Sequence, residues 1–404
     1  MVLFNRAENN LISFYKENDL KASFRNLNSK NSLLAYHTMR NRFFSERLNL
    51  LPYNFNNLNI LEFGPESGEN SLSFALNGAK LTLVEPNQDS CKRLLSYFKD
   101  YNLENKIQNL FTTDMLNFDV KQKFDFIDAE GFVATIKPYD LWFKKSHKLL
   151  KKEGLLLISF FEKRGSFFER FINLLPKISL ENTNDSKKNH KSFIKSVMKN
   201  KFPTNNLSRS IDTWYFDHLI NPFAQINWQI DSQNLIDYAN KFGFSLYSSY
   251  PNYKNNNEVT WYKSSQETKK FLEDTKENIK RNSLSFMFGG NFYFYGPKNK
   301  LALFDKNIMK IISKLSDLEK IVSITKVENF INEISELRSF LYIHKDYFLS
   351  KDFKNGIVGL NILIETLELA KSNKSDLIIK KLSNNNWFKN FWGSPVHFTV
   401  FRKK

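Results

Sequence analysis

Between residues 59 and 161 the sequence alternates short β-type runs with segments of helix length. The β-type runs lie at 59–63, 80–84, 107–112, 124–127 and 154–160. Strands that alternate with helices form parallel sheets, because each helix carries the chain back to the same edge through a right-handed crossover. This segment therefore predicts an α/β fold built on a parallel sheet.

A glycine-containing turn follows the first predicted strand and precedes a segment of helix length. Gly64 and Gly68 allow the backbone to turn tightly and to approach a ligand closely, and Glu62 stands at the end of the strand. The next strand ends at Glu85, about 20 residues beyond the turn, where folds of this kind hold a ribose diol. These positions predict a nucleotide site at the carboxyl edge of the sheet.

Glu62 bears on which nucleotide is bound. A dinucleotide would bring its pyrophosphate to the glycine turn, where a carboxylate would repel it. A ligand with a sulfonium and an amino group would be attracted instead. The turn thus favours a cationic nucleoside ligand over a dinucleotide.

These residues resemble the class I S-adenosylmethionine-dependent methyltransferase family, whose glycine motif has the form E-x-G-x-G-x-G. Glu62, Gly64 and Gly68 match the motif, whereas Glu66 replaces its middle glycine. The resemblance implies a Rossmann-like seven-stranded sheet and an enzyme that uses S-adenosyl-L-methionine. Because of Glu66, an inactive protein that binds the cofactor and acts as a scaffold remains an alternative.

Further motifs of the family follow in order. Glu85 and Pro86 resemble its ribose-binding motif, and the segment 113–115 resembles its adenine loop, in which Asp114 would accept a hydrogen bond from the adenine amino group. The segments 123–131 and 149–159 resemble its fourth-strand motif and its fifth strand. The cofactor contacts that we expect are Glu62, Gly64, Pro65, Gly68, Glu85, Pro86, Asp114, Met115 and Asp128.

Candidate catalytic residues follow from the chemistry of methyl transfer, which requires alignment of the two partners and, for some acceptors, removal of a proton. A polar cluster at 209–222 contains Asp217 beside His218, and the imidazole of histidine titrates near neutral pH. Asp128 and Glu130 follow the fourth predicted strand. We therefore expect His218, Asp217, Asp128 and Glu130 to be catalytic.

The nature of the acceptor is constrained mainly by missing patterns. Many enzymes that methylate nucleic-acid bases carry D/N-P-P-Y/F/W after the fourth strand, where this chain has Asp128-Ala-Glu-Gly131. Cys91 lies after the second strand, so it is expected to be structural rather than nucleophilic. The six histidines have no short ligand spacing and no cysteine pair exists, so we expect no metal.

The favoured function is therefore methylation of a small molecule or a glycan, such as a nucleotide sugar or a surface saccharide. Two short patches, after Arg209 and at 391–401, are loosely similar to methyltransferases encoded among bacterial surface-polysaccharide genes. The alternative is a nucleic-acid methyltransferase acting on RNA, which would use the basic surface.

Net charge, hydropathy and cysteine content bear on the kind of partner and on the location of the protein. The formal charge is +17 at pH 7, which favours an anionic acceptor, although an AT-rich genome explains abundant lysine equally well. The longest apolar run, 154–161, is far shorter than the roughly 20 residues of a membrane-spanning helix. One cysteine and a first segment without a signal-peptide pattern predict a cytoplasmic protein.

The expected organisation has four parts. Residues 1–50 form a helical preface, and residues 51–266 form the methyltransferase domain, with a variable substrate loop near 174–222. Within it, the stretch 181–210 is rich in Asn, Lys and Ser, which predicts an exposed connection. Residues 267–385 form a mainly helical insertion that caps the acceptor site or makes a homodimer contact. Residues 386–404 return to the sheet as its final, antiparallel strand.

Overall fold

The computed structural model describes residues 2–17, 29–180, 186–205, 210–254 and 267–404. It divides into two compact units that are both discontinuous along the chain. Unit 1 comprises Met1–Phe160, Ser232–Lys254 and His397–Lys404. Unit 2 comprises Phe161–Asp231 and Asn255–Val396. Within the described residues, no helix combines the length and the apolar character that a bilayer span requires.

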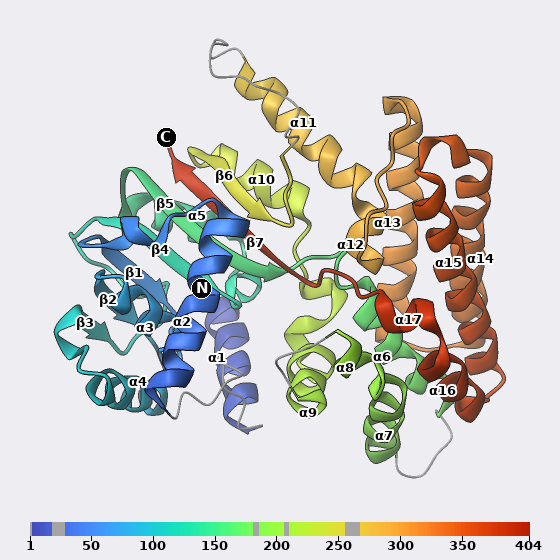
Figure 1. Ribbon diagram of the computed structural model, residues 1–404, viewed down its shortest axis with the longest axis horizontal. Helices are drawn as coiled ribbons and strands as arrows, with labels where there is room; N and C mark the ends of the chain where they lie inside the picture. The colour runs from blue at the N-terminus through green and yellow to red at the C-terminus, as the bar shows by residue number, and fades with distance from the viewer. Residues whose placement is uncertain (1, 18–28, 181–185, 206–209, 255–266) are drawn as a thin grey trace. The chain divides into compact units, whose positions relative to one another are not determined.

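Unit 1 is built on one sheet whose strands follow the order β3-β2-β1-β4-β5-β7-β6 (Figure 1). The pairs of β1 with β2 and β4, of β2 with β3, and of β4 with β5 are parallel, whereas β6 and β7 are antiparallel. The strands are β1 (Asn59–Phe63), β2 (Lys80–Val84), β3 (Ile107–Phe111), β4 (Phe124–Glu130), β5 (Leu150–Phe161), β6 (Phe244–Tyr250) and β7 (Val396–Lys403). The expected α/β, Rossmann-like fold with a final antiparallel strand is therefore confirmed.

The helices of unit 1 cover both faces of this sheet. They are α1 (Val2–Glu17), α2 (Lys30–Leu48), α3 (Glu69–Leu76), α4 (Gln88–Asp100), α5 (Tyr139–Leu149) and α10 (Ser232–Lys241). On one face, Phe44 of α2 and Phe74 of α3 share a core with Ile60 and Phe126 of the sheet. Because side chains alternate along a strand, residues 61 and 63 face the other side, where Phe63 contacts Trp142 of α5.

This alternation positions the predicted acids. Glu62 shares its face with Ile60, and Asp128 with Phe126, because each pair is two residues apart on one strand. Both carboxylates therefore lie on the sheet face that α2 and α3 cover, whereas Glu85 directly follows the end of β2.

Unit 2 is helical and packs around a large core of its own. Its helices are α6 (Phe167–Ser179), α7 (Ser186–Met198), α8 (Lys201–Thr204), α9 (Ile211–Trp214), α11 (Glu267–Arg281), α12 (Ser283–Phe288), α13 (Lys298–Lys320), α14 (Ile324–Ile343), α15 (Ser350–Lys371), α16 (Ser375–Asn384) and α17 (Asn386–Asn390). The apolar faces of α13, α14 and α15 meet α6 and α7 in this core. The segment between β6 and β7 in the sequence supplies most of these helices, as its 3.6-residue periodicity predicts.

The prediction of an exposed connection at 181–210 is wrong for most of its described residues. Residues 186–198 and 201–204 are helical, and Phe193, Ile194, Val197 and Met198 are buried in the core of unit 2. These four side chains lie on one helical face, a signal that the surrounding Asn, Lys and Ser residues hid. Residues 181–185 and 206–209, including Arg209, lie outside the described residues.

Candidate functional site

The glycine turn adopts the conformation that its residue types predict. Gly64 and Gly68 have φ values of +66° and +87°, in the left-handed region that favours glycine. A Cβ at Gly68 would lie 2.7 Å from Cγ of Leu94, so a larger residue would clash with α4. The amide of Gly64 donates to the carbonyl of Val84 at 2.9 Å, which ties the turn to the end of β2.

Glu66, at the position of the missing middle glycine, also has a positive φ of 48°. Its carboxylate accepts a hydrogen bond from the amide of Ser67 at 2.6 Å and pairs with Arg93 of α4 at 2.8 Å. The left-handed conformation that glycine would adopt freely is thus stabilised by side-chain contacts. The turn keeps its shape without the glycine.

Glu85 is buried at the end of β2 and is fixed by two backbone groups. The amides of Glu66 and Asn87 donate to its two carboxylate oxygens at 3.0 and 2.8 Å. Burial nevertheless raises the pKa of Glu85 to about 7, because the two amides and Arg93 only partly offset the loss of water. The glycine turn and the predicted ribose acid are therefore joined by a direct hydrogen bond.

A cluster of acids lies where β1 and β4 end. Glu62 and Asp128 are paired in register on these neighbouring strands, and both are buried. Glu62 accepts a hydrogen bond from the hydroxyl of Ser71 on α3. Glu130, two residues beyond Asp128, forms an ion pair of 2.6 Å with Arg40 of α2.

Asp128 is the least satisfied member of this cluster. It is 1% exposed, and neither of its carboxylate oxygens has a hydrogen-bond partner among the described residues. Burial raises its pKa well above the ordinary range, and the neighbouring Glu130 and Glu62 raise it further, against the smaller opposing effect of Arg40. Burial likewise raises the pKa of Glu62 to about 8. A buried carboxylate without a partner is costly, and a cationic group placed beside it would offset that cost.

The predicted adenine loop follows β3. Asp114 is half-buried, and one of its oxygens accepts from the amide of Asn117 at 2.8 Å while the other accepts from the Asn117 side chain. Each carboxylate oxygen can accept a second bond, so Asp114 keeps the capacity to bind an amino group. Met115 is buried beside it, and Cys91 is buried and contacts the carbonyl of Glu85.

Comparison with known proteins decides the family. The family model described as a methyltransferase domain matches residues 36–249, more than half of the chain. The chain belongs to this family. Its seven-stranded sheet and the glycine turn at β1 are those expected of class I S-adenosylmethionine-dependent methyltransferases.

Solved methyltransferases resemble the chain only distantly. The N-methyltransferase NodS from Bradyrhizobium japonicum WM9, in complex with S-adenosyl-L-homocysteine, is 17% identical over 38% of this chain and 74% of its own, with a TM-score of 0.29. An S-adenosylmethionine-dependent methyltransferase from Clostridium acetobutylicum ATCC 824 is 14% identical over 32% and 51%, with a TM-score of 0.26. No curated protein matches the sequence.

The remaining predicted residues of the methyltransferase lie in unit 2. Asp217 and His218 occupy a π-helical turn, Tyr215–Ile220, and both are buried. His218 Nδ1 lies 2.9 Å from Oε2 of Glu169 on α6, whereas Nε2 lies 3.8 Å from Oδ2 of Asp217. The side chain that hydrogen-bonds His218 is therefore Glu169, 49 residues earlier in the sequence, and not its neighbour.

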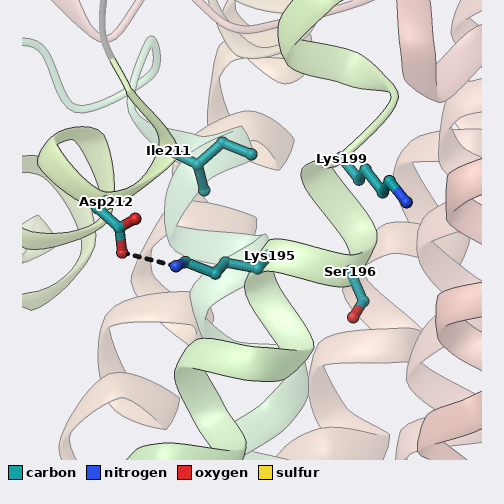
Figure 2. A pocket seen from close by; sticks show the side chains of 5 residues that line it. All are labelled: Lys195, Ser196, Lys199, Ile211 and Asp212. Carbon is teal, nitrogen blue, oxygen red and sulfur yellow. Dashed lines mark ion pairs between the residues drawn. The ribbon is translucent and has the colours of Figure 1, made fainter.

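A surface pocket of about 420 Å³ lies elsewhere in unit 2, between α7 and α9 (Figure 2). Lys195, Ser196, Lys199, Ile211 and Asp212 line it, and the figure shows Lys195 extended toward Asp212. Asp212 pairs with Lys195 at 2.9 Å and with Lys191 at 2.7 Å, so the pocket is not uniformly basic. None of the predicted site residues lines it.

The sequence did not indicate two residues that contribute to these clusters. Arg40 is 6% exposed, and its ion pair with Glu130 spans 90 residues. Glu169 is 2% exposed in α6, a mostly apolar helix that also carries the buried Arg170 and Asn173. A charged residue inside an apolar helical face was the available signal for Glu169, because such a residue needs a buried partner.

Proposed function

We propose that this methyltransferase binds S-adenosyl-L-methionine at the carboxyl edge of β1, β2 and β4 and transfers its methyl group to an anionic small-molecule or saccharide acceptor. The observation that carries the cofactor site is Asp128, a buried carboxylate without a partner beside Glu62. The cofactor carries a sulfonium and an ammonium group, which would offset the excess of acids in this cluster.

The nucleoside half of the cofactor would bind along the glycine turn. Glu85 would accept hydrogen bonds from both ribose hydroxyls, with Pro86 beside it, while its present amide donors keep the carboxylate in place. Asp114 and Met115 would contact the adenine. Gly64, Pro65 and Gly68 would let the backbone approach, since neither glycine carries a Cβ.

The amino-acid half would meet the acid cluster and Arg40. Asp128 and Glu62 would face the positive groups, and Arg40 is a buried guanidinium in the same cluster, suited to the carboxylate of the cofactor. The Nε of Arg40 has no hydrogen-bond partner among the described residues, and its pair with Glu130 uses only the two terminal nitrogens. The cluster therefore holds one cation beside several acids, a distribution that complements an ammonium and a carboxylate on one carbon.

The bound cofactor supplies an electrophilic methyl group on sulfur. The residues of the chain orient it and keep water away, because β1, β4 and α2 bury the acid cluster. Asp128 and Glu130 of unit 1 and Asp217 and His218 of unit 2 stay our candidates for catalysis. A single buried cysteine agrees with the cytoplasmic location that we propose.

An anionic acceptor is supported by the net charge of +17. The test is transfer of labelled methyl from S-adenosylmethionine to a panel of nucleotide sugars, with bulk RNA in parallel at physiological salt. We expect label in the sugar fraction and none in RNA. Label in RNA that falls steeply with rising salt would instead support the nucleic-acid alternative.

A further inference from the structure

The side chain of Glu66 folds back over the turn between β1 and α3. Its Oε2 accepts hydrogen bonds from the amide of Ser67 at 2.6 Å and from the Ser67 hydroxyl. Its Oε1 accepts from Arg93 of α4 at 2.8 Å, and Arg93 also donates to the hydroxyl of Ser90 at 3.0 Å. Because the side chain of Glu66 is only 17% exposed, water and salt screen this ion pair less than a surface pair. The turn is thus anchored to α4.

The backbone of Glu66 makes a second connection, to the acid that we place at the ribose. Its amide donates to Oε2 of Glu85 at 3.0 Å, while the amide of Asn87 donates to Oε1 at 2.8 Å. Glu85 is 5% exposed, so these amides replace much of the water that its carboxylate would otherwise bind. Because Arg93 holds the side chain of Glu66, it also limits how far the amide of Glu66 can turn away from Glu85.

The charges of Glu66 and Arg93 act on Glu85 with opposite sign. Burial raises the pKa of Glu85 to about 7, and the carboxylate of Glu66 adds to this rise while Arg93 opposes it. Cys91 of α4 also lies beside Glu85, but burial raises the pKa of its thiol, so it stays neutral near pH 7. An ionised carboxylate only accepts hydrogen bonds, whereas a protonated carboxyl must also place its own proton. Two ribose hydroxyls therefore favour the ionised form of Glu85.

We propose that Glu66 and Arg93 are positioning residues of the ribose site: Arg93 promotes, and the carboxylate of Glu66 opposes, the binding of a ribose diol by Glu85 near neutral pH. This inference rests on the proposed function. All of the residues involved lie in unit 1. The residue that replaces the middle glycine then does more than fill its place in the turn, because together with Arg93 it sets the affinity for the nucleoside half of the cofactor.

The probe for this inference is 5′-methylthioadenosine. It has the adenine and the ribose of the cofactor but neither its ammonium nor its carboxylate, so it has no charge to pair with Glu62, Asp128 or Arg40. Its affinity for the full chain is measured by calorimetry between pH 6 and pH 8. We expect the affinity of the wild type to rise about 10-fold over this range, because a carboxyl with a pKa of about 7 ionises within it.

Two substitutions that break the same ion pair should shift this pH profile in opposite directions. Glu66→Gln removes a negative charge beside Glu85 and should move the midpoint to lower pH, whereas Arg93→Gln removes a positive charge and should move it to higher pH. Glu66→Gly, at a position with φ of 48°, measures the same shift if the glutamine variant does not fold. Lys92→Gln is the matched control, because Lys92 lies on the same helix but is exposed and paired with Asp89. It should leave the midpoint in place.

Midpoints that move in the same direction, or a folded variant of either residue whose midpoint does not move, overturn the inference. A merely structural ion pair would weaken binding alike in both variants and at every pH. An equal affinity of the wild type at pH 6 and pH 8 overturns it as well. S-adenosylhomocysteine separates the two proposals: a wild type that binds it but not methylthioadenosine contradicts this inference alone, whereas one that binds neither contradicts the proposed function too.

Discussion

At the scale of single residues, the protonation of Glu62 links stability to pH. Its pKa is about 8 in the folded protein and near 4.5 when it is exposed to water, because burial penalises the charged form. Between these values the unfolded chain releases a proton that the folded chain keeps, so the free energy of unfolding falls as pH rises. The fall is largest, about 1.4 kcal/mol per pH unit, where the difference is one whole proton, and it ends above about pH 8.

We predict that Glu62→Gln loses less stability than the wild type between pH 5 and pH 8, because glutamine does not titrate. Urea denaturation at both pH values measures the difference. Glu85 titrates in the same direction up to about pH 7, so part of the decline will remain in the variant. An equal decline in the two proteins would show that Glu62 is ionised when folded.

Arg40 is predicted to recognise the carboxylate of the cofactor. In Arg40→Met the affinity for S-adenosylhomocysteine should fall roughly 10- to 100-fold, since a charge-assisted hydrogen bond contributes about 1.5–3 kcal/mol. The affinity for a decarboxylated analogue should change much less. Arg42→Met is the matched control, because Arg42 lies on the same helix but is exposed and paired with Glu46. Equal losses for both ligands would contradict the assignment.

The acids at strand ends could be predicted from the sequence because each follows a β-type run at a fixed spacing. Arg40 and Glu169 could not be placed in the same way. Their partners, Glu130 and His218, are brought to them only by the packing of a helix on a distant segment. The spacing of residues within one strand or helix does not predict pairs between distant segments. For His218, adjacency suggested Asp217, yet in the structure Glu169 makes the short contact.

At the scale of elements, the glycine turn should be sensitive to a single methyl group. Gly68→Ala adds a Cβ 2.7 Å from Leu94 to a residue with φ of +87°, so strain and a steric clash combine. We predict a loss of about 2–4 kcal/mol in the free energy of unfolding.

Gly131→Ala is the matched control for this prediction. Gly131 has the same φ of +87°, but its added Cβ would meet nothing within 4 Å, so only the cost of the conformation, about 1 kcal/mol, remains. Chemical denaturation of both variants separates the two contributions. If both variants lost the same free energy of unfolding, α4 would have shifted to accommodate the new methyl group at residue 68.

The ends of a strand agree with the sequence-based prediction where the strand is a run of apolar residues with turn residues on both sides. β1 and β2 begin and end at the predicted residues, 59–63 and 80–84. β5 begins earlier than predicted, at Leu150, because its pairing with β4 shifts register and Glu153, in the extra stretch, has a positive φ of 62°. Such a bulge depends on the neighbouring strand, which the sequence of β5 alone does not describe.

At the scale of the whole molecule, each unit is assembled from separate segments of the chain, three in unit 1 and two in unit 2. Residues 161–231 share the core of unit 2 with helices from 267–390, and β7 returns to the sheet of unit 1 after those helices. The return of the last strand could be predicted from its alternating pattern. The common core of unit 2 could not, because it depends on packing between helices far apart in the sequence, such as α6 with α15 and α7 with α16. The predicted division of the chain and the role of residues 267–385 as a cap or dimer contact stay predictions.

The central claim is that unit 1 binds the cofactor through the turn and the strand-end acids. Calorimetric titration of S-adenosylmethionine into the full chain tests it most directly, with Glu85→Ala in parallel and Glu46→Ala, on an exposed helix face, as control. We predict saturable binding by the wild type and the control, and a markedly weaker affinity in a folded Glu85→Ala. No binding at millimolar cofactor, or an unchanged affinity in Glu85→Ala, would contradict the account.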